Sequence, residues 1–178
     1  NRVSVGPLKV GDRLVTDDTE MAGMLNSYFC TVFTHEDISN MKEPEQLYMG
    51  DRPVEEASFT EENVKKKLSA LKPSAAPGPD GVWTRILHQL AECLSGPLAT
   101  IFTKLFQEGQ VPEIWRRANV CPIYKKGTKG YPGNYRPVSL TSIVCKLLES
   151  FVRDSIQNHM ESLNLHSDCQ QGFRSGRS

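Results

Sequence analysis

The sequence contains no long hydrophobic run. No apolar segment approaches the roughly 18 residues of a membrane-spanning helix, and the first residues lack the apolar core of a secretory signal. With 38% hydrophobic and 24% charged residues in a chain of 178, the composition is typical of a globular protein. We expect one domain, or one domain with an appendage, and no membrane partner. The missing initiator methionine and the turn-like basic end lead us to expect a fragment.

The sequence also has few cysteines, and none of them forms a close pair. The five are separated by gaps of more than twenty residues: Cys30, Cys93, Cys121, Cys145 and Cys169. Zinc ribbons and fingers use Cys-x-x-Cys pairs, so this class is excluded. An odd number of cysteines without a secretory signal favours free thiols in a reducing, intracellular compartment.

Several catalytic motifs are missing as well. There is no G-x-x-x-x-G-K-[ST] phosphate loop, no G-x-G-x-x-G fingerprint and no G-x-S-x-G elbow. The four histidines lack the spacing of metal ligands, and Asp154 and Asp168 have no partner carboxylate nearby in the sequence. We therefore assign no catalytic residue and no bound metal to this chain.

Charge is present but unevenly distributed. The formal net charge is zero, yet residues 1–81 carry about −5 and residues 82–178 about +5. Residues 115–136 contain six lysines and arginines and no acid. A basic half within a neutral chain indicates polyanionic partners.

Hydrophobic periodicity and turn chemistry predict the elements of the first part of the chain. A short hairpin is expected around Gly11-Asp12, then a helix capped by Asp17. Residues 34–57 are acidic and proline-marked, as in a linker. Thr60 is the expected N-cap of the next helix, and the Pro79-Asp80-Gly81 turn follows in an exposed, tight connector.

The second part is expected to contain a helix pair, two strands and a long helix. The helix that begins near Trp83 should be broken at Gly96-Pro97, and its continuation should end at Gly109. Residues 118–124 and 136–140 read as two short strands of a hairpin with a basic tip. Residues 141–164 form a long amphipathic helix with an inward stripe from Val144 to Leu163.

The hairpin tip has the composition of a phosphate-binding loop. Lysine supplies compact charge, arginine supplies a bidentate fork, and glycine lets the backbone approach an anion. Three tyrosines nearby are candidates for stacking on bases or sugars: Tyr124, Tyr131 and Tyr135. A basic surface loop without a ligand explains the same composition, and the sequence leaves both interpretations open.

The last residues, QQGFRSGRS, offer a second candidate. Gly172, Phe173, Arg174 and Arg177 combine backbone freedom, an aromatic face and charge, which suits single-stranded nucleic acid. A polar chain end without a ligand is the alternative.

Four stretches then occur in a fixed order. They are APGPDG at 76–81, WRRANVCPIYKKG at 115–127, NYRPVSLTS at 134–142 and QQGFRSGRS at 170–178. In this order and spacing they resemble the front part of the reverse transcriptase of a non-LTR, LINE-type retrotransposon of the jockey-like kind. The resemblance is strong over residues 55–178. The earlier stretch from Pro7 to Thr34 is similar to the connector between endonuclease and polymerase.

The resemblance implies a helix-dominated α+β fold. Residues 1–57 would be the connector, and residues 58–178 would be the N-terminal extension and fingers of a right-hand polymerase without its palm. By this resemblance Lys125 and Arg136 would hold the triphosphate of the incoming dNTP. Nucleic-acid contacts would come from Arg116, Arg117, Lys126, Lys129, Gly172, Phe173, Arg174 and Arg177.

The resemblance also implies partners and a cofactor. They are an RNA template, a DNA primer, an upstream endonuclease, a downstream palm and Mg²⁺ for the full-length enzyme. The family places a catalytic Asp after its GFR stretch and a Y-x-D-D turn later, and neither motif occurs in the sequence. Two-metal chemistry needs these carboxylates, so we expect no polymerisation by this chain alone. One alternative is an inactive remnant that binds RNA or serves as an interaction module. Another is a group II intron-type maturase, which shares the finger motifs, but the jockey-like connector argues against it.

Overall fold

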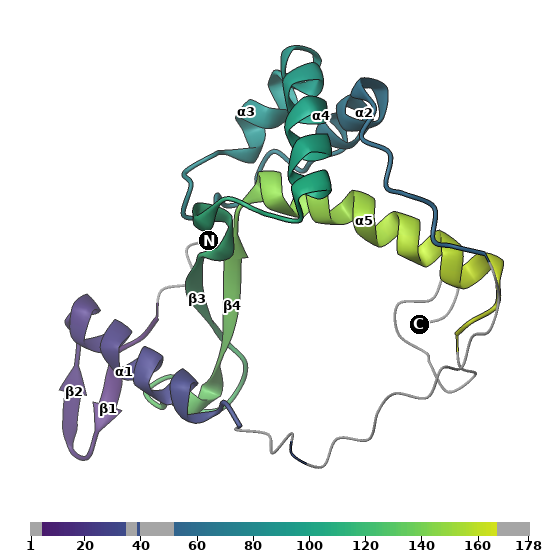
Figure 1. The fold of residues 1–178 in the computed structure, drawn as a ribbon. Helices are drawn as coiled ribbons and strands as arrows, with labels where there is room; N and C mark the ends of the chain where they lie inside the picture. Colours follow the sequence, from purple (N-terminus) through teal and green to yellow (C-terminus); the bar gives the residue numbers. More distant parts are fainter. Residues whose placement is uncertain (1–4, 35–38, 40–51, 167–178) are drawn as a thin grey trace. The chain divides into compact units, whose positions relative to one another are not determined.

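The computed structural model describes residues 5–34, 39 and 52–166. The chain packs as two compact units. The first comprises Asn1–Glu43 with Ala118–Leu140, and the second comprises Pro44–Arg117 with Thr141–Ser178. Figure 1 shows the elements of both units along the chain. Each unit has its own hydrophobic cluster and is described by itself.

The first unit contains two hairpins and one helix. Strands β1 (Leu8–Val10) and β2 (Arg13–Val15) pair antiparallel, with Leu8 opposite Val15. Helix α1 (Asp18–Thr31) follows, and β3 (Ala118–Tyr124) pairs with β4 (Tyr135–Thr141) in the second hairpin. The short 3-10 helix η2 (Pro132–Asn134) lies between them. The buried cluster is small and consists of Leu8, Val15, Met21, Leu25, Phe29 and Tyr135.

Local signals in the sequence predicted much of this unit. The Gly11-Asp12 hairpin is confirmed, and Gly11 has the positive φ of +58° that its turn requires. The Asp17 cap is confirmed, since its carboxylate accepts a bond of 2.8 Å from the Glu20 N–H. The Glu20 carboxylate itself pairs with Arg13 at 2.9 Å. Both strands of the second hairpin are confirmed.

The register of that hairpin follows from its closing bond. The Lys125 N–H donates to the Asn134 carbonyl oxygen at 2.8 Å, so counting back along both strands places Tyr124 opposite Tyr135. Hydrogen-bonded and non-hydrogen-bonded pairs alternate in an antiparallel ladder. Pro122 therefore lies opposite Pro137 in a non-hydrogen-bonded pair, where the missing N–H groups point away from the partner strand.

The second unit is helical. It contains α2 (Glu61–Ser69), α3 (Thr84–Gln89), α4 (Ala91–Glu108), the 3-10 helix η1 (Glu113–Arg116) and α5 (Ile143–Ser162). The core brings together Val64 and Leu68 of α2, Phe102 of α4 and the first half of α5. Phe59 joins them, with its ring centroid 6.1 Å from that of Phe102 and 5.4 Å from that of Phe151. The predicted Thr60 cap is confirmed by a bond of 3.3 Å from the Asn63 N–H.

The predicted helix break at Gly96-Pro97 is wrong. The break falls at Leu90, whose φ of −100° and ψ of 21° lie outside the helix, and Pro97 lies inside α4. A Cβ at Gly96 would make only ordinary contact with the Glu61 carboxylate, at 3.5 Å. The buried Ser95 hydroxyl lies 2.9 Å from the Glu92 carbonyl oxygen and 3.3 Å from Glu61 Oε1.

Several apolar residues of these helices are only partly buried. Ile86 of α3 and Leu90, which follows it, are about half exposed at 49% and 46%. In α5 the stripe is buried as far as Phe151, whereas Ile156 is 50% exposed. The helix-dominated α+β class is confirmed, and no helix of the described residues has the length and apolar character to cross a membrane.

The APGPDG loop is less exposed than a surface connector. Gly78 is buried, and a Cβ at this position would lie 2.6 Å from the Ser142 nitrogen and from the Thr141 carbonyl carbon. The loop therefore packs its backbone directly against the residues that begin α5. Gly81 adopts φ of +67°, and its N–H donates to the Gly78 carbonyl oxygen at 3.1 Å.

Candidate nucleic-acid interface

The fingertip loop, defined as residues 125–134, is held in one conformation by its own polar groups. The Asn134 side-chain amide donates to the Thr128 carbonyl oxygen at 2.8 Å, across the loop. Gly127 has φ of +88°, and a Cβ there would lie 2.7 Å from Asn134 Nδ2. Glycine is therefore required at 127 for both conformation and space.

Two tyrosine hydroxyls add to this support. The Tyr124 hydroxyl donates to the Gly127 carbonyl oxygen, and the Tyr135 hydroxyl donates to the Lys129 carbonyl oxygen at 2.7 Å. Their rings pack with centroids 5.8 Å apart, and Tyr135 is buried. These two tyrosines therefore support the loop through its backbone carbonyl groups. Of the three tyrosines considered for stacking, only Tyr131 is largely exposed, at 59%.

Lys125 and Arg136 stand at the base of the loop. Lys125 directly follows β3, and Arg136 is the second residue of β4. Side chains alternate along a strand, so Arg136 points to the face opposite Tyr135. Both side chains are exposed.

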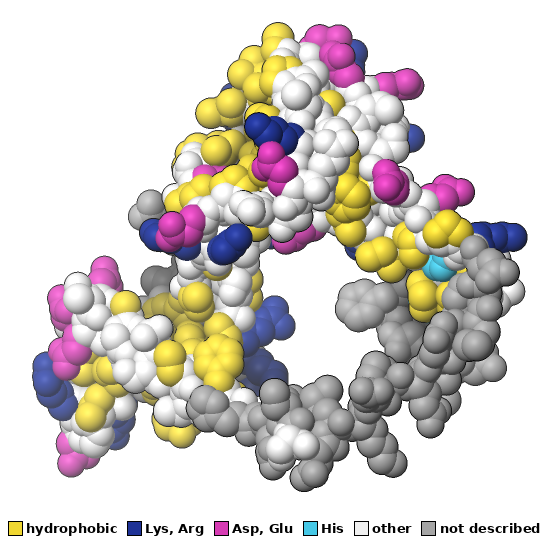
Figure 2. All heavy atoms as spheres, viewed as in Figure 1, with side chains coloured by type: hydrophobic (Ala, Val, Ile, Leu, Met, Phe, Trp, Pro, Cys, Tyr) yellow, Lys and Arg dark blue, Asp and Glu magenta, His cyan; other side chains and the backbone are white. Residues whose placement is uncertain are grey.

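The other predicted cations have different surroundings. The Lys129 ammonium lies over the Tyr124 ring at 5.6 Å from its centroid, and Lys126 is exposed. Arg116 and Arg117 belong to the second unit, where Arg117 pairs with Glu113 and is partly neutralised. Figure 2 shows lysine and arginine side chains gathered beside the β3–β4 hairpin. Gly172, Phe173, Arg174 and Arg177 lie outside the described residues.

Segments far away in the sequence complete the support of the loop. The Lys9 N–H of β1 donates to the Gly130 carbonyl oxygen at 2.7 Å. From α1, the Tyr28 hydroxyl lies 2.9 Å from the place that a Cβ on Gly133 would take. Sequence reasoning did not place Tyr28 at this loop. Its helical spacing is that of a core position, and nothing local indicates that it reaches the loop.

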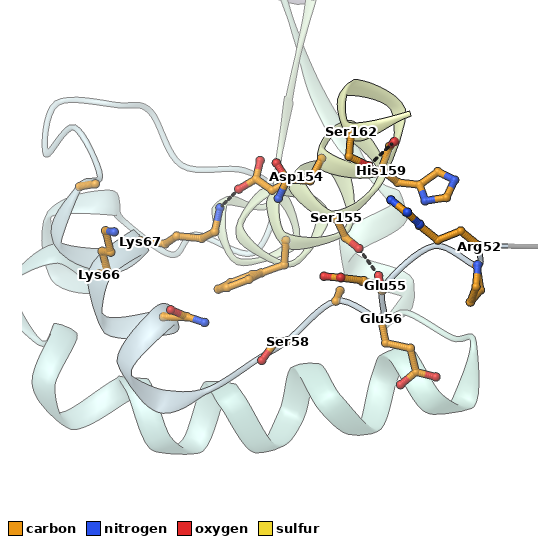
Figure 3. A pocket seen from close by; sticks show the side chains of 16 residues that line it. Arg52, Glu55, Glu56, Ser58, Lys66, Lys67, Asp154, Ser155, His159 and Ser162 are labelled. Carbon is orange, nitrogen blue, oxygen red and sulfur yellow. Dashed lines mark hydrogen bonds and ion pairs between the residues drawn. The ribbon is translucent and has the colours of Figure 1, made fainter. Parts of the chain in front are cut away.

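The second unit has a groove of about 660 Å³ between the 52–58 segment, α2 and α5. Figure 3 shows Lys67 reaching toward Asp154 at its wall; their charged atoms are 2.5 Å apart, and the Lys67 ammonium lies 4.7 Å from the Phe151 ring centroid. Burial alone raises the pKa of Asp154, but hydrogen bonds from Lys67 and Arg153 outweigh it and leave the pKa below its ordinary value.

Other ionisable groups do not assemble a metal site in this structure. Among residues 5–34, 39 and 52–166, no three His, Cys, Asp or Glu side chains gather in a way that would hold a metal ion. Cys145 is buried beside Glu149, and burial together with that carboxylate raises the pKa of its thiol to about 11. The thiol is therefore protonated and unreactive at neutral pH.

The chain is similar to several known proteins of transposable elements. The chain is 26% identical over 94% of its length to a probable RNA-directed DNA polymerase from transposon BS of Drosophila melanogaster. It is 30% identical over 76% of its length to the RNA-directed DNA polymerase from mobile element jockey of Drosophila funebris. A putative 115 kDa protein of the type-1 retrotransposable element R1DM is 26% identical over 97% of the chain. No family model matches.

The chain is much shorter than these relatives. It spans 19%, 14% and 16% of their respective lengths, less than a fifth in each case. The matches nevertheless cover most of the chain and agree in kind with one another. The chain is therefore homologous to one part of the RNA-directed DNA polymerases of jockey-like and R1-type, non-LTR retrotransposable elements.

Proposed function

We propose that the chain is the N-terminal extension and fingers part of a mobile-element RNA-directed DNA polymerase, preceded by a connector in residues 1–57. In this proposal Lys125 and Arg136 bind the triphosphate of the incoming dNTP. The observation that carries it is the acid-free fingertip loop, which is closed by its own hydrogen bonds and has these two exposed cations at its base. A preformed loop binds a phosphate without first losing its own conformational entropy.

The remaining cations take a sequence-independent role. Lys126, Lys129, Arg116 and Arg117 would neutralise phosphates of template and primer, as would Arg174 and Arg177. Gly172 and Phe173 would lie against the template. The polymerisation chemistry and Mg²⁺ belong to the palm of a longer protein, so no catalytic step is derived from this chain.

A second candidate function is that of an RNA-binding or interaction module without catalysis. It is favoured by an exposed apolar face on α3 and α4, which Figure 2 shows as hydrophobic side chains over these helices. The residues are Trp83, Ile86, Leu90 and Ile101, all more than two-fifths exposed. Contiguous exposed apolar surface is typical of protein contacts.

The first test is the salt dependence of RNA binding by the 178-residue chain. We expect the affinity for a fluorescein-labelled oligouridylate to fall linearly with salt on logarithmic axes, because bound phosphates release counterions. Replacing Lys126→Ala and Lys129→Ala together, the two loop lysines assigned to template and primer phosphates, should reduce the slope by about 1.4, or about 0.7 per charge for a single strand. A matched control, Lys72→Ala with Arg85→Ala, removes the same charge from the second unit and should leave most of the slope. An unchanged slope in the first variant contradicts the loop assignment.

A second measurement separates the two candidate functions. A dNTP titrated into the isotope-labelled chain should shift the amide resonances of residues 125–134, and replacing Lys125→Ala and Arg136→Ala together should abolish these shifts. RNA binding without any dNTP-dependent shift would favour the non-catalytic module.

A further inference from the structure

The fingertip loop carries one largely exposed aromatic side chain. Tyr131 is 59% exposed, whereas the other two tyrosines of the hairpin are occupied with loop carbonyls. Lys125, Lys126 and Lys129 precede it in the sequence, and residues 115–136 contain no acid.

The ring is nevertheless held in place from two sides. Tyr28 of α1 contacts it edge to face, with centroids 6.3 Å apart and an angle of 61° between the rings. Gly133 lies under both: a Cβ there would be 2.7 Å from Tyr131 Cε1 and 2.9 Å from the Tyr28 hydroxyl. Only glycine allows the two rings to converge on this backbone.

The backbone at this position is fixed as well. The Tyr131 N–H donates to the Thr128 carbonyl oxygen at 3.2 Å, and the Asn134 N–H donates to the Tyr131 carbonyl oxygen at 3.0 Å. Tyr28 is in turn packed against Phe29, with ring centroids 6.2 Å apart, and Phe29 belongs to the buried cluster of the unit. The support of Tyr131 therefore runs from the core of the unit to the loop.

We propose that Tyr131, supported by Tyr28 across Gly133, is a stacking platform for an unpaired base of single-stranded RNA. A rigid ring loses little entropy on stacking, and every base offers a face to it regardless of sequence. The neighbouring lysines neutralise the phosphates on either side of the stacked nucleotide. This inference rests on the proposed nucleic-acid role of the loop and adds the residue that contacts a base.

The test separates base stacking from phosphate binding. The 178-residue chain is titrated with two fluorescein-labelled strands of equal length, one an oligouridylate and one an abasic ribose-phosphate strand. We expect Tyr131→Ala to weaken binding of the base-bearing strand by about tenfold, the effect typical of one stacked base. The salt slope should not change, because no charge is lost. Wild type and Tyr131→Ala should bind the abasic strand equally.

Further variants guard against a general effect on the fold. Tyr131→Phe keeps the ring and should bind like wild type, whereas Tyr28→Leu removes the edge contact and should give an intermediate loss. Phe33→Ala removes an exposed aromatic that follows α1, 77% exposed, and should have no effect. Circular dichroism checks that each variant is folded.

The outcomes distinguish this inference from the proposed function. If Tyr131→Ala binds both strands like wild type while the salt slope persists, the stacking platform is wrong and the phosphate-binding loop stands. If Tyr131→Ala also lowers affinity for the abasic strand, the ring acts through loop structure, and the platform is again wrong. If wild type shows no salt-dependent affinity for either strand, both proposals fail.

Discussion

The two compact units are stabilised in different ways. The second unit buries a continuous apolar cluster in which Phe59, Phe102 and Phe151 meet, as a helical bundle does. The first unit has a cluster of six buried residues, and its fingertip loop is held mainly by polar bonds to carbonyl oxygens. Apolar burial contributes much of the stability and depends little on exact geometry, whereas hydrogen bonds in a loop require a specific geometry. The first unit, which carries the candidate site, is therefore held by hydrogen bonds, and these fix the positions of its loop residues.

The largest expected effect is on the core of the second unit. Phe102 is fully buried, and Phe102→Ala should destabilise the chain by about 3–5 kcal/mol through lost burial and a cavity. Phe106 lies one turn further along α4 and is 41% exposed, so Phe106→Ala should cost much less. Urea unfolding gives the free energies, and hydrogen exchange by segment shows where protection is lost. Equal loss in the fingertip loop and in α4 would mean that the two units unfold together, and the comparison would fail.

A smaller effect is expected in the first unit. Tyr135→Phe keeps the buried ring but removes the bond to the Lys129 carbonyl oxygen, at a cost of about 1 kcal/mol. Hydrogen exchange should accelerate at residues 127–134 and not in α2, α4 or α5. Tyr131→Phe is the matched control, because the Tyr131 hydroxyl makes no hydrogen bond within the described part of the chain. Unchanged exchange in Tyr135→Phe would show that the loop does not depend on this bond.

The smallest effect is electrostatic and depends on pH. Asp154 has a lowered pKa in the folded chain, so its contribution is present above the unfolded value of about 4 and is lost as the pH falls through the folded value. Asp154→Asn should cost less than about 1 kcal/mol at pH 7, because both partners are partly exposed. Urea unfolding of both proteins at pH 7 and at pH 3 should show the difference shrinking in acid. A difference that grows in acid would reverse the assigned sign. Glu108→Gln, in the exposed pair with Lys104, is the control and should change little at either pH.

Prediction from the sequence succeeded where the cause is local. Asp17 and Thr60 cap the N–H groups three residues ahead of them, and the Gly11-Asp12 turn closes on its immediate neighbours. The two strands that flank the basic tip were also found, with Lys125 and Arg136 at its ends. These features need only the residues beside them.

Prediction failed where contacts with distant segments determine the local structure. Gly96-Pro97 reads as a helix break, but α2 brings Glu61 against Gly96 and the helix continues. Tyr135 reads as a candidate for stacking, but its hydroxyl is used by the Lys129 carbonyl oxygen. The contact of Tyr28 with the loop joins residues about a hundred positions apart, and no periodicity within either segment reports it.

The facing prolines of the second hairpin have a consequence for its surroundings. A two-stranded ribbon normally exposes rows of N–H groups along both margins, where a further strand can attach. Pro122 removes one such group from the margin of β3, and Pro137 removes the group at the same level of β4. Strand addition is thus interrupted on both sides at mid-length. The ribbon remains two strands wide, and its partners meet its faces and its tip instead of extending it into a sheet.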